Sequence, residues 1–230
     1  QPIPYRCLRS ERISSCEKIH CSIQRSKMSA KDNYPIVTLP EGYREVYYLS
    51  IKQPKTMILL NVLSVVLFAV SAVIVFVPLI AYHEVLDAPL VINSLPDEIS
   101  LLLGLLLVML VLPLHEWIHG QFIKLCGHKP RYGIKFLVLF ATADGAYFRR
   151  NEFVRIAMAP LIVISLLGLT IMLFLPGGLA VWVALAVLLN AGGAIGDIWM
   201  TIAALRFDPS ALVQDEADSI RIFTGKLQTM

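Results

Sequence analysis

Four long apolar stretches, separated by shorter charged segments, dominate the chain from residue 57 onward. Each stretch reaches or exceeds the roughly 20 mostly apolar residues that a helix needs to cross a bilayer. They cover residues 57–80, about 99–124, about 153–175 and about 179–205. Four such stretches in succession favour membrane-spanning helices over the buried helices of a soluble domain. The pattern therefore predicts an all-α polytopic membrane protein with about four transmembrane helices.

The segment between the second and third stretches, residues 131–150, follows a different pattern. Its apolar run 134–141 is too short to cross a bilayer as a helix and is rich in residues that favour strands. Asp144-Gly145 is a typical two-residue hairpin turn. We therefore expect a small β-hairpin at the cytoplasmic leaflet, with this dipeptide at its turn. An amphipathic surface loop is the alternative interpretation.

The charged residues between the stretches predict the orientation of the chain, because Lys and Arg near the ends of spanning helices favour the cytoplasmic side. The connection at 81–98 carries acidic residues and neither Lys nor Arg. Basic residues precede the first stretch, lie between the second and third, and follow the fourth. We therefore predict a multi-pass protein of the cell membrane with both termini in the cytoplasm.

The chain is expected to divide into an N-terminal cytoplasmic segment (1–38), a membrane-embedded domain (39–205) and a C-terminal cytoplasmic tail (206–230). Residues 1–27 show no periodicity, whereas Met28 opens a stretch typical of a bacterial start. We expect residues 1–27 to be upstream or cloning-derived sequence. A metal-binding tail is the alternative, but the pair Cys16 and Cys21 has no second close pair to complete a four-ligand site.

The composition agrees with a membrane protein and excludes two other classes. The chain is 57% hydrophobic and 16% charged, with a mean hydropathy of +0.68, whereas a soluble domain has about 45–50% apolar and about 25% charged residues. This apolar content excludes intrinsic disorder. A net charge of +3 without a dense basic stripe gives no basis for nucleic-acid binding.

The second stretch contains the sequence His115-Glu116-Trp117-Ile118-His119, which is an HExxH motif. On a helix, residues four apart share a face, so both imidazoles can reach one metal ion while Glu116 reaches its bound water as a general base. An ionised group inside a spanning helix costs about 2–3 kcal/mol unless it pairs or binds something. The alternative is that the two histidines only form hydrogen bonds to other helices.

A catalytic zinc site usually has three protein ligands, and Asp197 in the fourth stretch is the candidate for the third. It lies roughly 12 Å from the cytoplasmic end of its stretch, and His115 lies roughly 14 Å from the end of its own, so the two depths match. Three nearby glycines would let another helix approach; they are Gly192, Gly193 and Gly196. Asn190 lies on the same helix face as Asp197. The alternatives for Asp197 are a pair with Arg206 or a place in a polar cavity.

These features resemble the site-2 proteases, which cleave peptide bonds within the membrane, and more closely a family of small bacterial membrane proteins described as putative zincin peptidases. The resemblance covers about residues 39–205. It rests on HEWIHG at 115–120 and Gly196-Asp197, and further on LPEGYREVYYLSI at 39–51 and Ala159-Pro160. It implies zinc held by His115, His119 and Asp197. The chain departs from the site-2 pattern because no proline lies between Asn190 and Asp197.

The sequence and the resemblance together predict a zinc-dependent intramembrane or membrane-associated peptidase that acts near the cytoplasmic leaflet. Glu116 is its expected general base. Asn190 is a second candidate catalytic residue that would bond the substrate backbone, and a contact between helices is the alternative role for this side chain. The expected cofactor is Zn²⁺, and the expected partners are a membrane protein or peptide substrate and the lipid bilayer, with no nucleic acid. The alternative is a non-catalytic membrane scaffold or transporter with a structural metal site.

Overall fold

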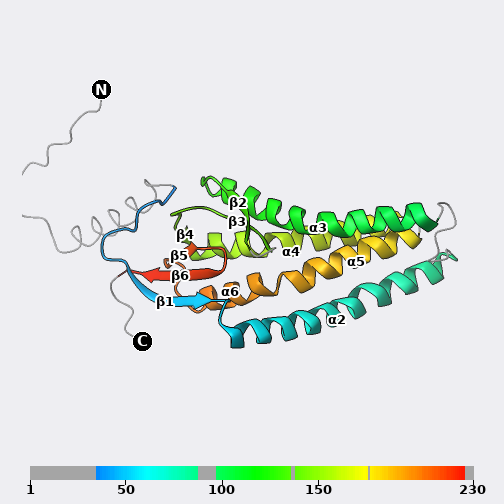
Figure 1. The fold of residues 1–230 in the computed structure, drawn as a ribbon, viewed down its shortest axis with the longest axis horizontal. Coiled ribbons are helices and arrows are strands. Elements are labelled where there is room, and N and C mark those ends of the chain that lie inside the picture. Colours follow the sequence, from blue (N-terminus) through cyan, green and yellow to red (C-terminus); the bar gives the residue numbers. More distant parts are fainter. Residues whose placement is uncertain (1–34, 88–96, 136–137, 176, 226–230) are drawn as a thin grey trace, which may run out of the picture. The chain divides into compact units, whose positions relative to one another are not determined.

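The computed structural model describes residues 35–87, 97–135, 138–175 and 177–225. These residues form long helices and two small antiparallel sheets, which Figure 1 labels in chain order. The predictions for residues 1–27 lie outside the described residues, as does much of the acidic connection at 81–98.

The described part of the chain contains five helices: α2 (Pro54–Val85), α3 (Asp97–Leu125), α4 (Arg150–Met172), α5 (Gly177–Gly193) and α6 (Ile195–Leu205). The prediction of long helices in the first three apolar stretches is confirmed. By length and composition, α2, α3 and α4 could each cross a membrane, and α5 with α6 adds a fourth span if the bent pair is counted as one. Pro54 is the first residue of α2, where a backbone N–H has no acceptor within the helix, so the proline costs no helical hydrogen bond.

The long helices keep large apolar side chains on their outer faces. Val65 and Val73 of α2 are 70% and 63% exposed, Met109 of α3 is 74% exposed and Leu166 of α4 is 62% exposed. A soluble protein rarely leaves apolar patches of this extent in contact with water. These faces are suited to contact with lipid hydrocarbon, which agrees with the sequence prediction of a membrane protein.

The fourth apolar stretch is two helices, so the prediction of one continuous helix over 179–205 is wrong. Helices α5 and α6 meet at a 42° bend around Ala194. Gly192 and Gly193 before the break and Gly196 after it weaken helix propensity locally, because glycine loses more backbone entropy than other residues in a helix. The break places Asp197 in the first turn of α6.

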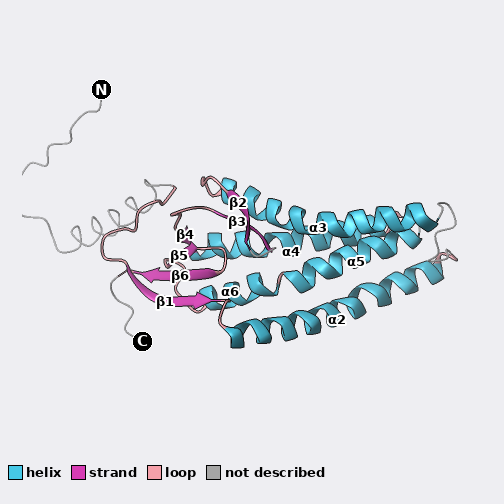
Figure 2. Cartoon of the chain, viewed as in Figure 1, coloured by secondary structure: helices cyan, strands magenta, loops and turns pink. Residues whose placement is uncertain are grey.

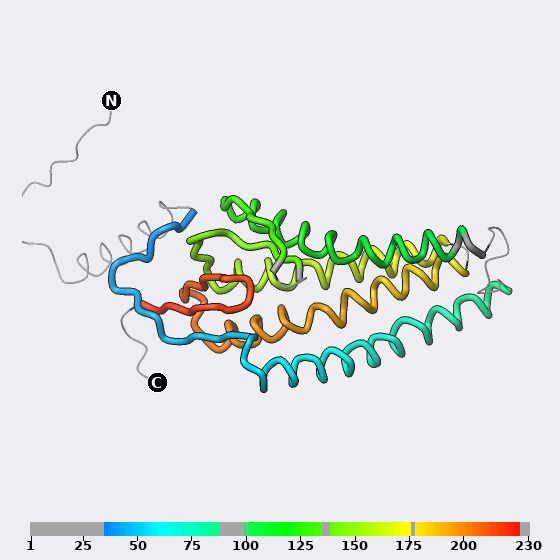
Figure 3. Tube along the Cα trace, viewed as in Figure 1, coloured from blue at the N-terminus to red at the C-terminus, as the bar shows by residue number. Residues whose placement is uncertain are grey.

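A four-stranded antiparallel sheet shows that the all-α prediction is wrong. Its strands are β1 (Arg44–Ser50), β4 (Phe148–Arg149), β5 (Leu212–Asp215) and β6 (Ser219–Thr224), in the order β1-β6-β5-β4. Segments from near both ends of the chain therefore lie side by side, as Figure 3 shows for the blue and red traces. The alternation of buried Ile220 and Ile222 with Arg221 is typical of a strand that packs one face on a core.

A β-hairpin between the second and third long helices is confirmed, but its expected turn at Asp144-Gly145 is wrong. The hairpin is formed by β2 (Arg131–Lys135) and β3 (Val138–Thr142), with Lys135 opposite Val138. Asp144-Gly145 does form a turn, with Gly145 at a φ of +67°, and it leads out of β3 toward β4. The dipeptide marks a turn correctly, but β4 pairs with β5 and not with β3.

Both sheets lie at the same end of the helices (Figure 2). One apolar core joins the four-stranded sheet to α4 and α6, and its members include Phe148, Phe153, Ile156, Met200, Ile220 and Ile222. The capping interaction from the Arg149 N–H to the Glu152 carboxylate, at 2.9 Å, fixes the start of α4 directly after β4. The sheet is thereby held against the segment of α4 that contacts the site described below.

Candidate metal centre

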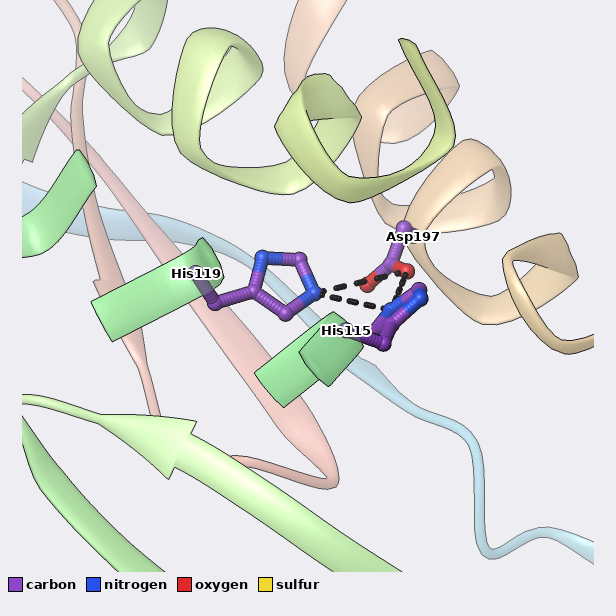
Figure 4. Close-up of side chains that lie close together, drawn as sticks. All are labelled: His115, His119 and Asp197. Carbon is purple, nitrogen blue, oxygen red and sulfur yellow. Dashed lines mark hydrogen bonds and ion pairs between the residues drawn. The ribbon is translucent and has the colours of Figure 1, made fainter. Parts of the chain in front are cut away.

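Three side chains from two helices converge at the break in the fourth apolar stretch. His115 and His119 lie one turn apart on α3, and Asp197 lies in the first turn of α6. The His115 Nε2 atom is 3.2 Å from Asp197 Oδ2 and 3.1 Å from His119 Nε2, and His119 Nε2 is 3.6 Å from Asp197 Oδ2. Figure 4 shows the three side chains pointing toward one another. The structure thus brings together the three residues that the sequence predicts as ligands.

Each imidazole is fixed from behind by an acceptor on another helix. His115 Nδ1 lies 2.9 Å from Asn190 Oδ1 in α5, and His119 Nδ1 lies 2.9 Å from the Ile156 carbonyl oxygen in α4. Because both partners are acceptors, each Nδ1 carries the proton and each Nε2 presents a lone pair to the centre. Such partners are common behind metal-binding histidines, because they fix the tautomer and the ring orientation.

The three converging atoms fit a zinc ion. Zinc bound to imidazole and carboxylate at about 2.0–2.2 Å in tetrahedral geometry places its ligand atoms about 3.4 Å apart. The three separations here are 3.1, 3.2 and 3.6 Å. Two neutral imidazoles and one carboxylate also form a donor set typical of catalytic zinc sites, which leave a fourth position for water or substrate.

Asp197 contacts the histidines rather than Arg206. Its carboxylate faces both imidazoles, whereas Arg206 follows the last residue of α6. In the described ranges of the chain, no ion pair joins Asp197 to Arg206. The alternative interpretation of Asp197 as the partner of this arginine is therefore wrong.

Glu116 lies beside the three side chains, in a cavity of about 170 Å³. The cavity is also lined by His115, His119 and Asp197, and by residues of β3. The Glu116 carboxylate is half-buried and accepts a hydrogen bond from the backbone N–H of Ala141 in β3. The hairpin that separates the second and third long helices in sequence therefore positions the carboxylate next to the converging ligand atoms.

Asn190 lies behind the centre rather than on the cavity. It is 1% exposed and is absent from the residues that line the cavity in the described part of the chain. Its Oδ1 contacts His115, and its Nδ2 donates to the Pro160 carbonyl oxygen at 3.4 Å. Both ends of the amide are therefore engaged by protein groups, which gives Asn190 a positioning role toward His115.

A third carboxylate, that of Asp215 at the end of β5, also lines the cavity and was not predicted from the sequence. Its Oδ1 accepts the backbone N–H of Ala217 at 2.8 Å. Burial raises the pKa of the Asp215 carboxyl to about 6 despite that hydrogen bond. A search for polar residues within apolar stretches cannot find it, because its strand lies outside them and approaches the site only through the sheet.

Ser64 of α2 supports the break that positions Asp197. Its hydroxyl donates to the Gly192 carbonyl oxygen at 2.7 Å, next to the bend between α5 and α6. Helix breaks within apolar surroundings persist when neighbouring side chains satisfy the backbone groups at the break. The serine thus connects the first long helix to the geometry of the site.

Replacing Ser64 with alanine is expected to lower the free energy of unfolding by about 1 kcal/mol, because a carbonyl at the break loses its donor. Thermal unfolding in detergent measures the change. Thr170→Val is the matched control, since the Thr170 hydroxyl donates to the Leu166 carbonyl of its own exposed helix turn. Equal shifts for the two variants would contradict the supporting role of Ser64.

The family described as "Putative zincin peptidase" matches residues 108–212, a range that includes His115, Glu116, His119, Asn190 and Asp197. No curated protein and no solved structure matches the chain. The matched range runs from the middle of α3 to the start of β5 and therefore contains every predicted ligand. Through these residues, the segment 108–212 is similar to the family described as putative zincin peptidases.

Proposed function

We propose that the protein is a zinc-dependent peptidase that works within or at the membrane and cleaves peptide bonds of a membrane protein or peptide near the cytoplasmic leaflet. The observation that carries this proposal is the convergence of His115, His119 and Asp197 on a cavity that the Glu116 carboxylate also lines. The family match supports a metallopeptidase. The apolar outer faces of the helices support a location in the bilayer.

The residues of the cavity divide the chemistry of hydrolysis between them. His115, His119 and Asp197 would hold the ion, which when bound supplies a Lewis acid for the scissile carbonyl and lowers the pKa of the attacking water. Glu116 would accept the proton of that water and deliver it to the leaving amine. Asn190 and the Ile156 carbonyl keep both imidazoles in the tautomer that binds metal.

The substrate is expected to add as a strand to the free edge of β3. Leu139, Phe140 and Ala141 of this strand line the cavity, and the Ala141 N–H on the edge away from β2 already bonds Glu116. A peptide held there would lie extended beside the ligand atoms. A helical substrate would have to unwind to bind in this way, and unwinding would expose its scissile bond. Unpaired strand edges are tolerated at membrane depth where they line a cavity.

The proposed orientation places both termini in the cytoplasm. Both sheets lie at one end of the helices, and Arg44, Arg131 and Arg149 are carried by strands at that end. Basic residues near the ends of spans favour the cytoplasmic side. Strands at this end also line the cavity, which agrees with cleavage near the cytoplasmic leaflet.

The test uses the full chain, purified in detergent and reconstituted with a panel of transmembrane peptides. Metal analysis is expected to find about one zinc per chain. A chelator should abolish cleavage, and added zinc should restore it, because the ligands supply no hydrolytic chemistry alone. Protein that stays free of zinc after zinc is added, or cleavage that survives the chelator, would overturn the proposal.

The same experiment separates the peptidase from a membrane scaffold or transporter with a structural metal. Zinc that is retained without cleavage of any peptide in the panel would favour the scaffold. A closed structural site has four protein ligands. The described residues supply three converging ligands and a neighbouring base, and this favours the peptidase.

A further inference from the structure

A second, wider cleft adjoins the cavity of the metal centre. It has a volume of about 500 Å³ and lies between the β2–β3 hairpin and the turn that joins β5 to β6. Phe140, Asp215 and Ala217 line both spaces. Asp215 therefore lies at the junction where the cleft meets the cavity that contains Glu116.

The Asp215 side chain is held firmly at this junction. Its Oδ1 is anchored by the Ala217 N–H, and its backbone carbonyl accepts the Thr142 hydroxyl of β3 at 2.9 Å. The second bond ties β5 to the strand that carries the cavity edge. The carboxylate is thus fixed relative to the hairpin and does not follow a mobile loop.

The other charged groups of the cleft are already paired with protein partners. Arg131 binds Asp144 through two contacts of 2.9 and 3.0 Å, and Glu216 accepts from Arg221 at 2.8 Å. No Lys or Arg forms an ion pair with Asp215 among the residues that the structure describes. Among the described carboxylates of the cleft, Asp215 is consequently the one that can form an ion pair with a bound ligand.

We propose that Asp215 selects substrates that carry a lysine or arginine side chain beside the scissile bond, an inference that rests on the proposed peptidase function. The carboxylate oxygen supplies the ion-pair partner, and Phe140 and Ile134 supply an apolar wall for the methylene stem of the cation. A cationic side chain also compensates a partly buried negative charge that the protein leaves unpaired. The residue acts on specificity, and the bond-breaking chemistry stays with Glu116 and the metal ligands.

Binding is measured first, because it does not depend on hydrolysis. Zinc-loaded Glu116→Gln protein is titrated with peptides of fixed sequence in which one lysine or one methionine occupies each position in turn. We expect lysine to bind about tenfold more tightly than methionine at one or two adjacent positions, because a hydrogen bond between two charged groups is stronger than one between neutral groups. Adding Asp215→Asn should remove this preference, and Asp215→Glu should keep most of it.

Asp144→Asn is the matched control, because Asp144 lines the same cleft but is 65% exposed and paired with Arg131. It should leave the lysine preference intact. Equal binding of lysine and methionine peptides, or equal loss of preference in both asparagine variants, would overturn the inference. Zinc content and thermal unfolding of each variant identify any general loss of structure.

Cleavage assays on the same peptides separate this inference from the proposed function. In protein with Glu116 intact, kcat/KM should show the same lysine preference and the same loss of it in Asp215→Asn. A lysine preference in binding without any cleavage would refute the peptidase and keep the cation site. Cleavage without any lysine preference would refute the cation site and keep the peptidase.

Discussion

Replacing Glu116 with glutamine is expected to lower the rate of peptide cleavage by a factor of about 10²–10⁴ while the protein keeps its zinc. The amide has nearly the same size and still offers an oxygen to the Ala141 N–H, so the cavity should keep its shape. The amide has no basic oxygen that can take a proton from water. Loss of a positioned general base typically lowers the rate by a factor of about 10²–10⁴. Single-turnover cleavage and metal analysis of the same sample measure the two effects.

Glu84→Gln is the control for this substitution, because Glu84 is an exposed carboxylate near the end of α2. It should change neither cleavage nor zinc content. If Glu116→Gln protein loses its zinc, Glu116 is a ligand rather than a base. If it cleaves at the rate of the unmodified protein, the proton is accepted by another group, and Asp215 on the same cavity is then the first candidate.

The metal ligands can be predicted from the sequence because polar residues inside an apolar stretch are few and helix geometry converts their spacing into depth. His115 and His119 share a face by their spacing alone. Asp197 follows from its matching distance to the helix end, even though α5 and α6 are separate helices. The bend does not change the distance from Asp197 to the predicted end of its stretch, because both lie in α6.

The sheets are less predictable, because their strands depend on contacts between segments far apart in the chain. Tyr48 of β1 pairs with Arg221 of β6, and Thr142 of β3 bonds the Asp215 carbonyl. Local patterns in charged segments cannot reveal such pairings, because strand formation depends on cross-strand neighbours more than on intrinsic propensity. Asp215 and the Ala141 contact to Glu116 are consequently visible only in the folded chain.

The role of Asn190 likewise depends on contacts that the sequence alone does not reveal. The sequence places it on the face of the helix that carries Asp197, which is compatible either with substrate binding or with a contact between helices. Its burial and its bond to His115 Nδ1 favour the second interpretation and connect it to the metal instead of the substrate. Substitution of Asn190 is therefore expected to change the affinity for zinc, whereas substitution of a residue that only binds substrate would leave that affinity unchanged.

Replacing Asn190 with leucine is expected to weaken zinc binding by about 10–100-fold, because partners behind a metal-binding histidine contribute this much to affinity. Leucine is similar in size but offers no acceptor, so the His115 Nδ1–H is left unpaired and the ring loses its fixed orientation. Asn190→Asp keeps an acceptor oxygen and should restore most of the affinity. Competition with a chelator of known affinity measures zinc binding, with His119→Ala as the reference for a disrupted site.

Thr201→Val is the matched control, since Thr201 is a buried polar residue of α6 whose hydroxyl has no hydrogen-bond partner within the described ranges. It changes a buried polar group near Asp197 without touching a ligand, so zinc affinity should stay the same. Thermal unfolding of the zinc-free proteins then separates stability from metal binding. Asn190→Leu protein that unfolds at a lower temperature but binds zinc normally would show that Asn190 only packs the helices together. A loss of zinc affinity that the aspartate variant reverses would instead establish that the Asn190 oxygen orients His115 for the metal.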